Sequence, residues 1–285
     1  MSGSSPVERS PRRCDLTRRS SSALQLADQI TPLIITFNEA ENIERVLNTL
    51  RWAHRIVVVD SGSNDGTLEI IADFPQAEII HRGFDSFAEQ CDFGLSQIQT
   101  EWVLSLDADY ELSDELVNEL KTLKNEPKLV GYRARFIYRV LGRPLRATLY
   151  PPRTVLYRVQ GARYVNEGHG HRVSVAGEIG SLRAPIYHDD HKPLSRWVKS
   201  QRIYALREAD YLLSAESKAL SWPDRVRRTG WLAPMLVLPY VLFVKGCVLD
   251  GRAGWFYALQ RLAAETMIAL ELLDRRFSAR GRRKI

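Results

Sequence analysis

The chain has 285 residues, of which 45% are hydrophobic and 26% are charged, and its formal net charge is +6. This length provides for one large α/β domain with an appendage, and the composition is that of an ordinary globular protein. Three cysteines, Cys14, Cys91 and Cys247, lie far apart and form no CxxC pair, which argues against a disulfide framework and a structural zinc site. Because no N-terminal apolar run resembles a signal peptide, we expect a cytoplasmic chain.

The positive charge is concentrated in the last third of the chain. Residues 30–191 carry 17 basic and 23 acidic side chains, whereas residues 192–285 carry 18 basic and 8 acidic ones. A basic region of this kind suits nucleic acid, anionic lipid or a phosphorylated substrate. Because apolar and aromatic residues crowd the same region, we favour a membrane surface as the partner and expect no nucleic acid.

The chain divides into three parts. Residues 1–29 are rich in Ser and Arg without hydrophobic periodicity, and we expect them to be disordered apart from a short helix near residues 24–26. Residues 30–192 form the expected α/β domain, in which apolar strands alternate with helices. The expected strands are 33–36, 55–60, 77–80 and 102–106, and the expected helices are 39–50, one from residue 67, and 84–98. This order predicts βαβ units and a mostly parallel sheet, followed by mixed or antiparallel strands after residue 130.

Residues 193–285 are expected to form a helical, basic and apolar region that associates with a membrane. Residues 229–244 are uncharged, contain Pro234 and Pro239, and are followed by Lys245. A bilayer span needs about 20 apolar residues, so we expect an interfacial or re-entrant element rather than a transmembrane helix. The basic residues of the tail suit anionic headgroups. A buried helical hairpin or an oligomer interface would explain the apolar residues equally well.

Acidic side chains follow three of the expected strands, at Glu39, at Asp60 and at the pair Asp107 and Asp109. Ligands bind beyond the carboxyl ends of the strands in an open parallel sheet, so these groups should converge. Two carboxylates spaced as Asp-x-Asp can bind Mg²⁺ or Mn²⁺, and the ion would neutralise a diphosphate leaving group. The alternatives are a turn or capping role for Asp60 and an acidic surface loop for the pair.

Three segments together resemble family-2 glycosyltransferases: residues 35–39 (ITFNE), 57–67 (VVVDSGSNDGT) and 104–109 (LSLDAD). The nearest branch is that of the lipopolysaccharide-core β-glucosyltransferases, and the similarity extends over residues 31–275. The resemblance implies a GT-A fold, the Rossmann-like fold of nucleotide-diphospho-sugar transferases. It also implies an inverting transfer from a nucleotide-sugar donor, a UDP-sugar in the first instance, to a lipid-linked or cell-envelope saccharide. Such an enzyme would be cytoplasmic and peripheral to the inner membrane.

The resemblance also implies roles for residues of the donor site. Thr36, Glu39 and Asp60 would hold the nucleoside, with Asp60 near the base. Asp65 would shape the loop beside it, and Gln90 would flank the donor from a helix.

Further roles concern the reacting end of the donor. Asp107 would lie near the ribose and diphosphate, Asp109 would bind the metal, and His188 would reach the metal or the diphosphate. Arg153 matches an arginine beside the sugar or acceptor, and Glu167 would be the general base. The sequence departs from the branch in two places: Tyr110 replaces a glutamate after Asp-Ala-Asp, and the acceptor loop 165–169 (VNEGH) lacks the histidine that usually precedes its glutamate.

Three alternative functions stay open. The first is a polyprenyl-phosphate glycosyltransferase, whose phosphate acceptor needs little base catalysis. The second is a nucleotidyltransferase, which would carry a Gly-rich, Arg-containing phosphate loop where this chain has residues 36–39 (TFNE). The third is an inactive membrane-associated binding module, which would have no use for two aspartates and Glu167.

Overall fold

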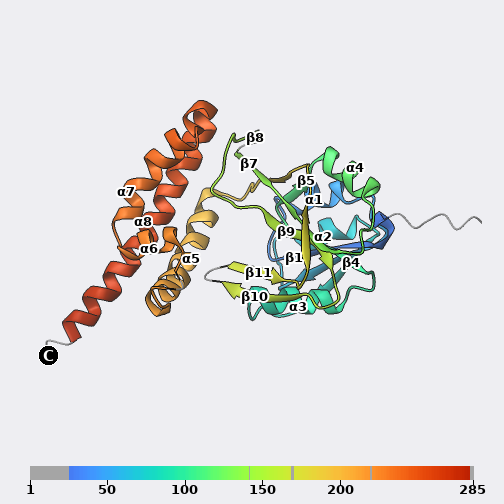
Figure 1. Ribbon diagram of the computed structural model, residues 1–285, viewed down its shortest axis with the longest axis horizontal. Coiled ribbons are helices and arrows are strands. Elements are labelled where there is room, and N and C mark those ends of the chain that lie inside the picture. The colour runs from blue at the N-terminus through green and yellow to red at the C-terminus, as the bar shows by residue number, and fades with distance from the viewer. Residues whose placement is uncertain (1–25, 141, 168–169, 219, 283–285) are drawn as a thin grey trace, which may run out of the picture.

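A computed structural model describes residues 26–282 except 141, 168–169 and 219. It has two parts, an α/β domain and a bundle of helices beside it (Figure 1). The largest sheet has seven strands in the order β12-β6-β9-β4-β1-β2-β3. Its strands are β1 (Ile30–Thr36), β2 (Ile56–Asp60), β3 (Ala77–His81), β4 (Trp102–Asp107), β6 (Leu129–Ala134), β9 (Arg153–Arg158) and β12 (Glu178–Ser181).

The predicted mostly parallel sheet is confirmed. Strand β1 pairs in parallel with β2 and β4, and β2 pairs in parallel with β3. Strand β9 is antiparallel to both β4 and β6, as expected for the chain after residue 130. The carboxyl ends of β1, β2 and β4 therefore lie at one edge of the sheet, with Thr36 beside Asp60 and Ile35 beside Asp107.

Helices cover both faces of this sheet (Figure 1). One face packs on α1 (Ile43–Thr49), α2 (Thr67–Ala72) and α4 (Asp114–Thr122), and the other packs on α3 (Phe87–Ser96). Neighbouring residues of β1 serve opposite faces: Ile34 belongs to the first core and Leu33 to the second. This is why the strands read as continuous apolar runs rather than as alternating ones.

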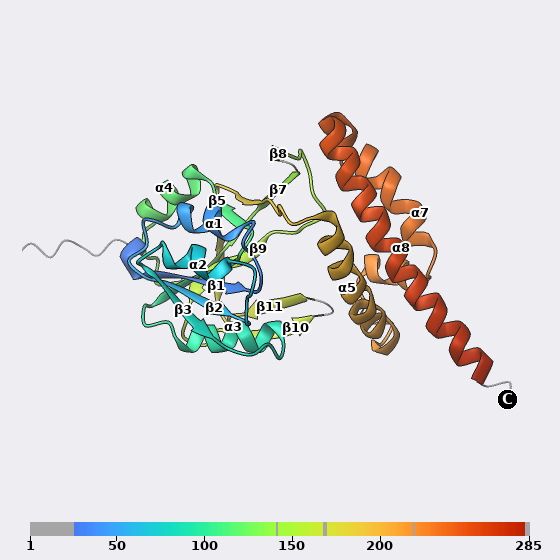
Figure 2. The ribbon, with the colours of Figure 1, turned by 180° about the vertical axis from the view of Figure 1, so that it is seen from behind.

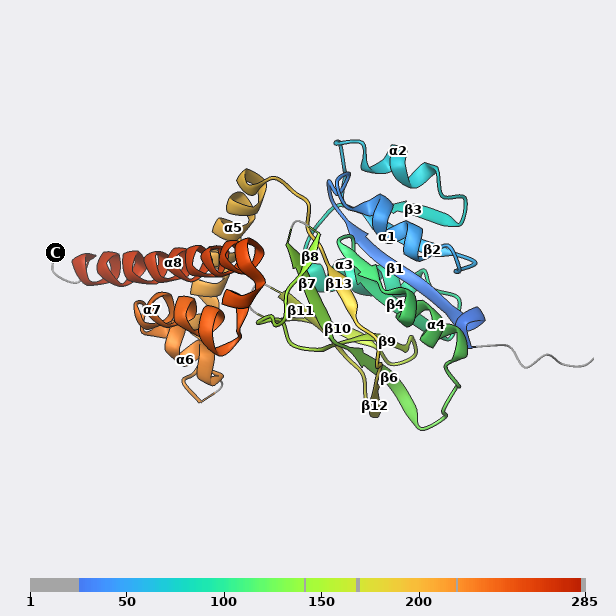
Figure 3. The ribbon, with the colours of Figure 1, turned by 90° about the horizontal axis from the view of Figure 1, so that it is seen from above.

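A smaller sheet of four strands, in the order β5-β13-β7-β8, brings distant segments to the end of β4. Its members are β5 (Tyr110–Leu112), β7 (Phe136–Val140), β8 (Arg143–Pro144) and β13 (Ile186–His188). Strands β10 (Arg163–Glu167) and β11 (Gly170–Ser174) form a separate antiparallel hairpin. The hairpin and the strands β7 and β8 lie on the side of the domain that faces the helices (Figure 3).

The helical part begins with α5 (Leu194–Ser214), which lies between α8 and the α/β domain (Figures 1 and 2). It continues through α6 (Trp222–Arg228), α7 (Leu232–Pro239), a π-helical turn η2 (Tyr240–Val244), a 3-10 turn η3 (Cys247–Asp250) and α8 (Gly251–Arg282). Arg227 of α6 binds Glu265 of α8 at 2.7 Å and lies 3.7 Å from Glu208 of α5. This buried charge network joins three helices.

Three sequence expectations need correction. The segment predicted as disordered extends four residues too far, because η1 (Leu26–Gln29) precedes β1 and Leu26 is buried in the main core; residues 1–25 lie outside the described chain. The β structure expected after residue 130 begins with two successive strands, β6 and β7, which pair in different sheets. The helix expected at 84–98 begins only at Phe87, because the Ser86 hydroxyl caps it by accepting a hydrogen bond from Glu89 N–H.

No single helix within residues 26–282, apart from the gaps, is long and apolar enough to cross a bilayer. One pair of helical segments, Leu232–Val244 and Cys247–Ala279, has the required length and composition together and is bent by 70°.

Candidate active site

The loop after β2 is organised by the carboxylate of Asp60, which is fully buried. It accepts hydrogen bonds from Gly62 N–H at 2.8 Å and from the Ser63 hydroxyl at 2.5 Å. His81 of β3 lies 3.3 Å away through Nδ1. The turn-forming role foreseen as an alternative for Asp60 is therefore present in the structure, and it fixes the loop beside the end of β1.

A second set of contacts joins this loop to the chain after β1. Asp65 accepts hydrogen bonds from the Thr67 hydroxyl at 2.5 Å and from Ala40 N–H at 3.3 Å, and Thr67 Oγ1 in turn accepts from Glu39 N–H at 2.7 Å. Burial alone would raise the pKa of Asp65, but these hydrogen bonds stabilise the charged form and lower it. Residues 38–40 and 60–67 thus form one connected platform.

Thr36 and Gln90 occupy different positions relative to this platform. The Thr36 hydroxyl is buried and has no hydrogen-bond partner among the described residues. Gln90 is fully buried and donates through Nε2 to the Ser61 hydroxyl at 2.8 Å and to the Arg82 carbonyl at 3.0 Å. Gln90 therefore supports the loop from α3, whereas Thr36 keeps an unused polar group.

Glu39 forms an ion pair with Lys192, a residue that was not predicted from the sequence. One carboxylate oxygen lies 2.7 Å from Lys192 Nζ, and the other accepts a hydrogen bond from the Asn42 amide at 2.9 Å. Burial raises the pKa of Glu39 to about 7 although Lys192 opposes the shift, and the charge of Asp109 raises it further. The pKa of Lys192 is raised, because Asp109 and Glu39 outweigh the opposing effect of burial.

Asp109 and His188 form the second charged centre. Nε2 of His188 lies 3.2 Å from Asp109 Oδ2, and both side chains are largely buried. Burial would raise the pKa of Asp109, but the facing imidazole lowers it to about 2. The pKa of His188 is raised, because Asp109 outweighs the opposing effect of burial. The ring of Tyr138 packs against the imidazole with centroids 4.1 Å apart.

Two buried polar atoms of this centre are left without hydrogen-bond partners among the residues that the structure describes. Asp109 Oδ1 and His188 Nδ1 are buried and lack hydrogen-bond partners within the described chain. The Asp107 charge contributes to the raised pKa of His188, so Asp107 lies near the pair. No group of three or more His, Cys, Asp or Glu side chains in the described residues is arranged to hold an ion. A carboxylate and an imidazole suit Mn²⁺ or Mg²⁺ only if phosphate or water oxygens complete the coordination.

Arg153 is held near this centre by an aromatic cluster that also contacts His188. Its guanidinium lies 4.4 Å from the ring centroid of Tyr150, whose hydroxyl is 2.5 Å from that of Tyr110. Tyr257 of α8 accepts a hydrogen bond from Leu149 N–H at 3.1 Å. A residue of the helical part therefore supports the segment that carries Tyr150 and Arg153.

The family model described as glycosyl transferase family 2 matches residues 32–176, which is half of the chain. The chain belongs to this family. An uncharacterized glycosyltransferase of Rickettsia bellii is 28% identical, covering 71% of this chain and 72% of the relative, and one of Rickettsia felis is 27% identical, covering 83% and 89%.

Two further likenesses are more limited. The lipopolysaccharide core biosynthesis glycosyltransferase LpsC of Rhizobium meliloti is 31% identical over 36% of this chain and 40% of its own length. The crystal structure of S. aureus TarS residues 1–349 with UDP aligns with a TM-score of 0.45 at 15% identity and covers 87% of this chain and 91% of that one. The GT-A fold and the glycosyltransferase activity of the family agree with the sequence expectation.

One residue of the candidate site, Lys192, was not predicted from the sequence. The only sequence signal for it was its position four residues after His188, which ends strand β13. One predicted residue, Glu167, has a side chain that lies outside the described part of the chain. Glu167 ends β10, where its backbone pairs with Gly170. The hairpin itself is anchored, because Tyr164 N–H donates to Asp92 of α3 at 2.9 Å.

Proposed function

We propose that this family-2 transferase moves a sugar from a nucleotide-diphosphate donor, a UDP-sugar in the first instance, to a lipid-linked or cell-envelope saccharide, with inversion. The observation that carries the proposal is the Asp109–His188 pair, which keeps two buried polar atoms unused next to Asp107. A buried polar group without a partner is costly, so its partner is expected to be a ligand.

The donor would lie across the carboxyl ends of β1, β2 and β4. The platform 60–67 would hold the nucleoside, with the unused Thr36 hydroxyl and the Glu39 carboxylate as polar contacts. Lys192 and Arg153 would supply positive charge near the diphosphate. When bound, Mg²⁺ or Mn²⁺ supplies the charge that stabilises the diphosphate as a leaving group. Asp109, His188 and Asp107 are the residues proposed to hold it.

The acceptor would enter from the side of the β10–β11 hairpin, where Glu167 is the proposed general base. Inversion in one step requires a carboxylate within hydrogen-bond reach of the attacking hydroxyl. Glu167 would take the hydroxyl proton while Arg153 orients the sugar. If the acceptor were a polyprenyl phosphate instead, its oxygen would already be ionised and Glu167 would be dispensable.

We also propose that the enzyme works at the cytoplasmic face of the inner membrane as a peripheral protein. Of the 21 large apolar side chains that are exposed in the described residues, 18 lie between residues 194 and 277. Phe243, Val244 and Leu249 are each about 70% exposed. Contiguous exposed apolar side chains on a basic region are typical of a membrane-binding surface.

A donor and acceptor panel tests the proposal. Purified enzyme is incubated with Mn²⁺, a set of radiolabelled nucleotide sugars and a bacterial membrane lipid extract, and products are separated and analysed for linkage. We expect label from a UDP-sugar in a lipid-linked saccharide with inverted anomeric configuration. Label on a polyprenyl phosphate would instead assign the alternative acceptor. The absence of both sugar transfer and donor hydrolysis with every nucleotide sugar tested would contradict the proposal.

A further inference from the structure

A basic hollow of about 600 Å³ lies in the helical part, between the α5–α6 connection, α6 and α8. Four cations line it together with Ser217 and Leu220: Lys218, Arg225, Arg228 and Arg276. No carboxylate belongs to its described lining. The hollow is formed entirely by the helical part, whereas the proposed donor site belongs to the α/β domain.

Backbone carbonyls and the Ser217 hydroxyl hold the three guanidinium groups in place. Arg225 Nε donates to the Leu220 carbonyl at 3.0 Å, and Arg276 donates to the carbonyls of Arg228 and Thr229. Arg228 Nη1 donates to the Ser217 hydroxyl at 3.0 Å. A guanidinium carries five N–H donors, so each of these groups keeps donors free for a ligand. The hollow is thus preorganised to receive acceptor oxygens.

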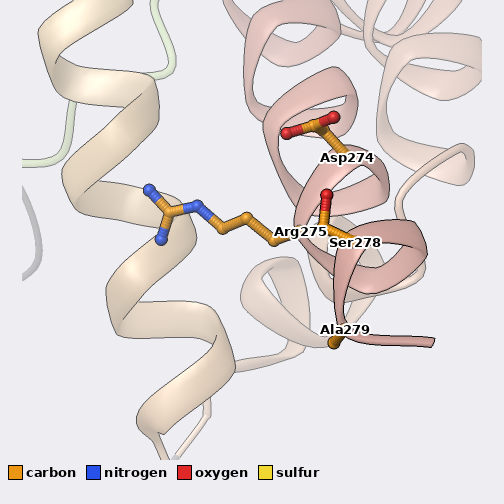
Figure 4. A pocket seen from close by; sticks show the side chains of 4 residues that line it. All are labelled: Asp274, Arg275, Ser278 and Ala279. Atoms are coloured by element: carbon orange, nitrogen blue, oxygen red, sulfur yellow. The ribbon is translucent and has the colours of Figure 1, made fainter. Parts of the chain in front are cut away.

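The charges in this hollow are not compensated, unlike those of neighbouring arginines. Arg227 binds Glu265 at 2.7 Å, and Arg275 binds Glu271 at 2.6 Å and also Asp210. A second hollow, lined by Asp274, Arg275, Ser278 and Ala279, therefore contains a neutralised cation (Figure 4).

By contrast, none of the four cations of the basic hollow has a carboxylate partner among the residues that the structure describes. Fixed arginines without counter-charges favour phosphate oxygens, which they can bind in pairs.

We propose that the basic hollow binds the phosphate group of an anionic membrane lipid. The exposed aromatic side chains beside it favour a lipid over a soluble phosphate. Trp222, three residues before Arg225, is 74% exposed, and Phe277, next to Arg276, is 65% exposed. Aromatic and basic side chains together are typical of the headgroup depth of a membrane.

The exposed face of α8 continues this surface. Trp255, Leu259, Leu270 and Phe277 are all exposed. Their spacings of 4, 11 and 7 residues place them on one stripe of a helix with 3.6 residues per turn. The choice of a lipid rests on the peripheral membrane association proposed above. The basic hollow adds to that association a defined position for a lipid headgroup.

The test is vesicle binding by the full chain carrying Lys218→Gln and Arg225→Gln. Both side chains are exposed, so the thermal midpoint should stay that of the unchanged protein. The control carries Lys121→Gln and Lys124→Gln, two exposed lysines of the α/β domain, and loses the same charge. Affinity is measured by flotation with vesicles of phosphatidylcholine and phosphatidylglycerol in equal parts. Removing one cation near the membrane surface should lower the vesicle affinity about fivefold, so removing both should lower it about 25-fold.

The outcomes separate this site from the membrane association as a whole. The site is supported if the hollow variant loses about 25-fold in affinity and the control variant loses much less. Equal affinities of the two variants would overturn the site and leave the membrane association standing. If the hollow variant loses calorimetric binding of inorganic phosphate but keeps its vesicle affinity, the hollow is a soluble-phosphate site and the lipid assignment is wrong. An unchanged protein that fails to bind these vesicles would overturn both proposals.

Discussion

Nε2 of His188 lies 3.2 Å from the Asp109 carboxylate, although 79 positions separate the two residues in the chain. The pairing of strands produces this contact, because β13 returns antiparallel to β5 and sets His188 opposite Tyr110, the neighbour of Asp109. The carboxyl end of β4 therefore receives an imidazole from a segment that precedes α5. The Asp109–His188 centre therefore lies at the segment that leads from the α/β domain into the helical part.

Lys192→Gln should destabilise the protein in a pH-dependent way. The folded-state pKa of Glu39 is about 7, above its ordinary value of 4.5, so Glu39 is mostly ionised and paired with Lys192 only above this range. Loss of the cation should cost about 3 kcal/mol at about pH 8, where it leaves a buried charge unpaired, and clearly less at about pH 5.5, where Glu39 is protonated.

The measurement is urea unfolding of the unchanged and variant proteins at both pH values. Lys199→Gln, on α5, is the control for loss of a lysine charge. A stability loss that is equal at both pH values, or larger in acid, would contradict the assigned titration of Glu39.

Tyr257→Phe should lower turnover without weakening nucleotide binding. The change removes the acceptor of the Leu149 N–H and loosens the segment that carries Tyr150 and Arg153. A displacement of about 1 Å at a reacting centre can cost about 10²-fold, so we expect a loss in kcat of about 10- to 100-fold. The affinity for UDP should stay unchanged, because the hydrogen bonds that hold the platform 60–67 come from the chain after β1, from α3 and from the loop itself rather than from Tyr257.

Steady-state kinetics and UDP titration measure the two effects separately. Tyr240→Phe, an exposed tyrosine of η2, is the matched control and should be silent. Equal losses of kcat and of UDP affinity would indicate general unfolding rather than positioning.

The sequence predicted the parallel half of the fold well, for a physical reason. Strands such as 102–106 are buried on both faces and read as uninterrupted apolar runs, and the helices between them have clear spacing. Beyond residue 130 the pattern is weaker, because 130–140 switches from one sheet to another at Arg135, which no local signal marks. The boundary at residue 30 was misplaced because the apolar contact of Leu26 with the main core is long-range.

Site residues could be predicted from the sequence where acidic side chains directly follow strands, and not elsewhere. Asp60, Asp107 and Asp109 follow strands directly, so their convergence follows from parallel pairing. Lys192 could not be assigned to Glu39, because this contact depends on how β13 and the chain after it fold back across the α/β domain. The hydrogen bond of Tyr257 with the Leu149 N–H could not be predicted from the sequence either, since it depends on how α8 packs against the α/β domain.

Glu167→Gln should lower turnover by about 10²–10⁴-fold, because a positioned general base contributes about this factor. Donor affinity should stay near normal, since the residue would act on the acceptor. Rates of sugar transfer and calorimetric donor affinity measure the two effects, with Glu178→Gln, exposed on β12, as the control. Turnover that barely changes would place the base elsewhere and favour a phosphate acceptor.

Phe243→Ser with Val244→Ser should release the enzyme from membranes. Both side chains are about 70% exposed, and their apolar surface would lie in the headgroup boundary, so their loss should weaken binding by about tenfold or more. Truncation is a poorer test than these substitutions, because Tyr257 and its neighbours pack against Leu145 of the α/β domain.

Membrane fractionation measures the change, with Phe84→Ser in the α/β domain as the control. The unchanged protein should be released in part by high salt and completely by detergent, since salt screens only the electrostatic attraction. Complete retention through an alkaline carbonate wash would show insertion instead of peripheral binding. A protein found wholly in the soluble fraction would contradict the membrane proposal.

The proposed metal and diphosphate site is tested by calorimetric titration of UDP into the protein with and without Mn²⁺, for the unchanged chain and for Asp109→Asn. We expect that Mn²⁺ strengthens UDP binding to the unchanged protein and has little effect on the variant, because Asp109 would supply the charged oxygen ligand that the ion needs. The variant should still bind UDP weakly through the intact platform 60–67. Equal strengthening by Mn²⁺ in both proteins would contradict the assignment of the metal and diphosphate to Asp109.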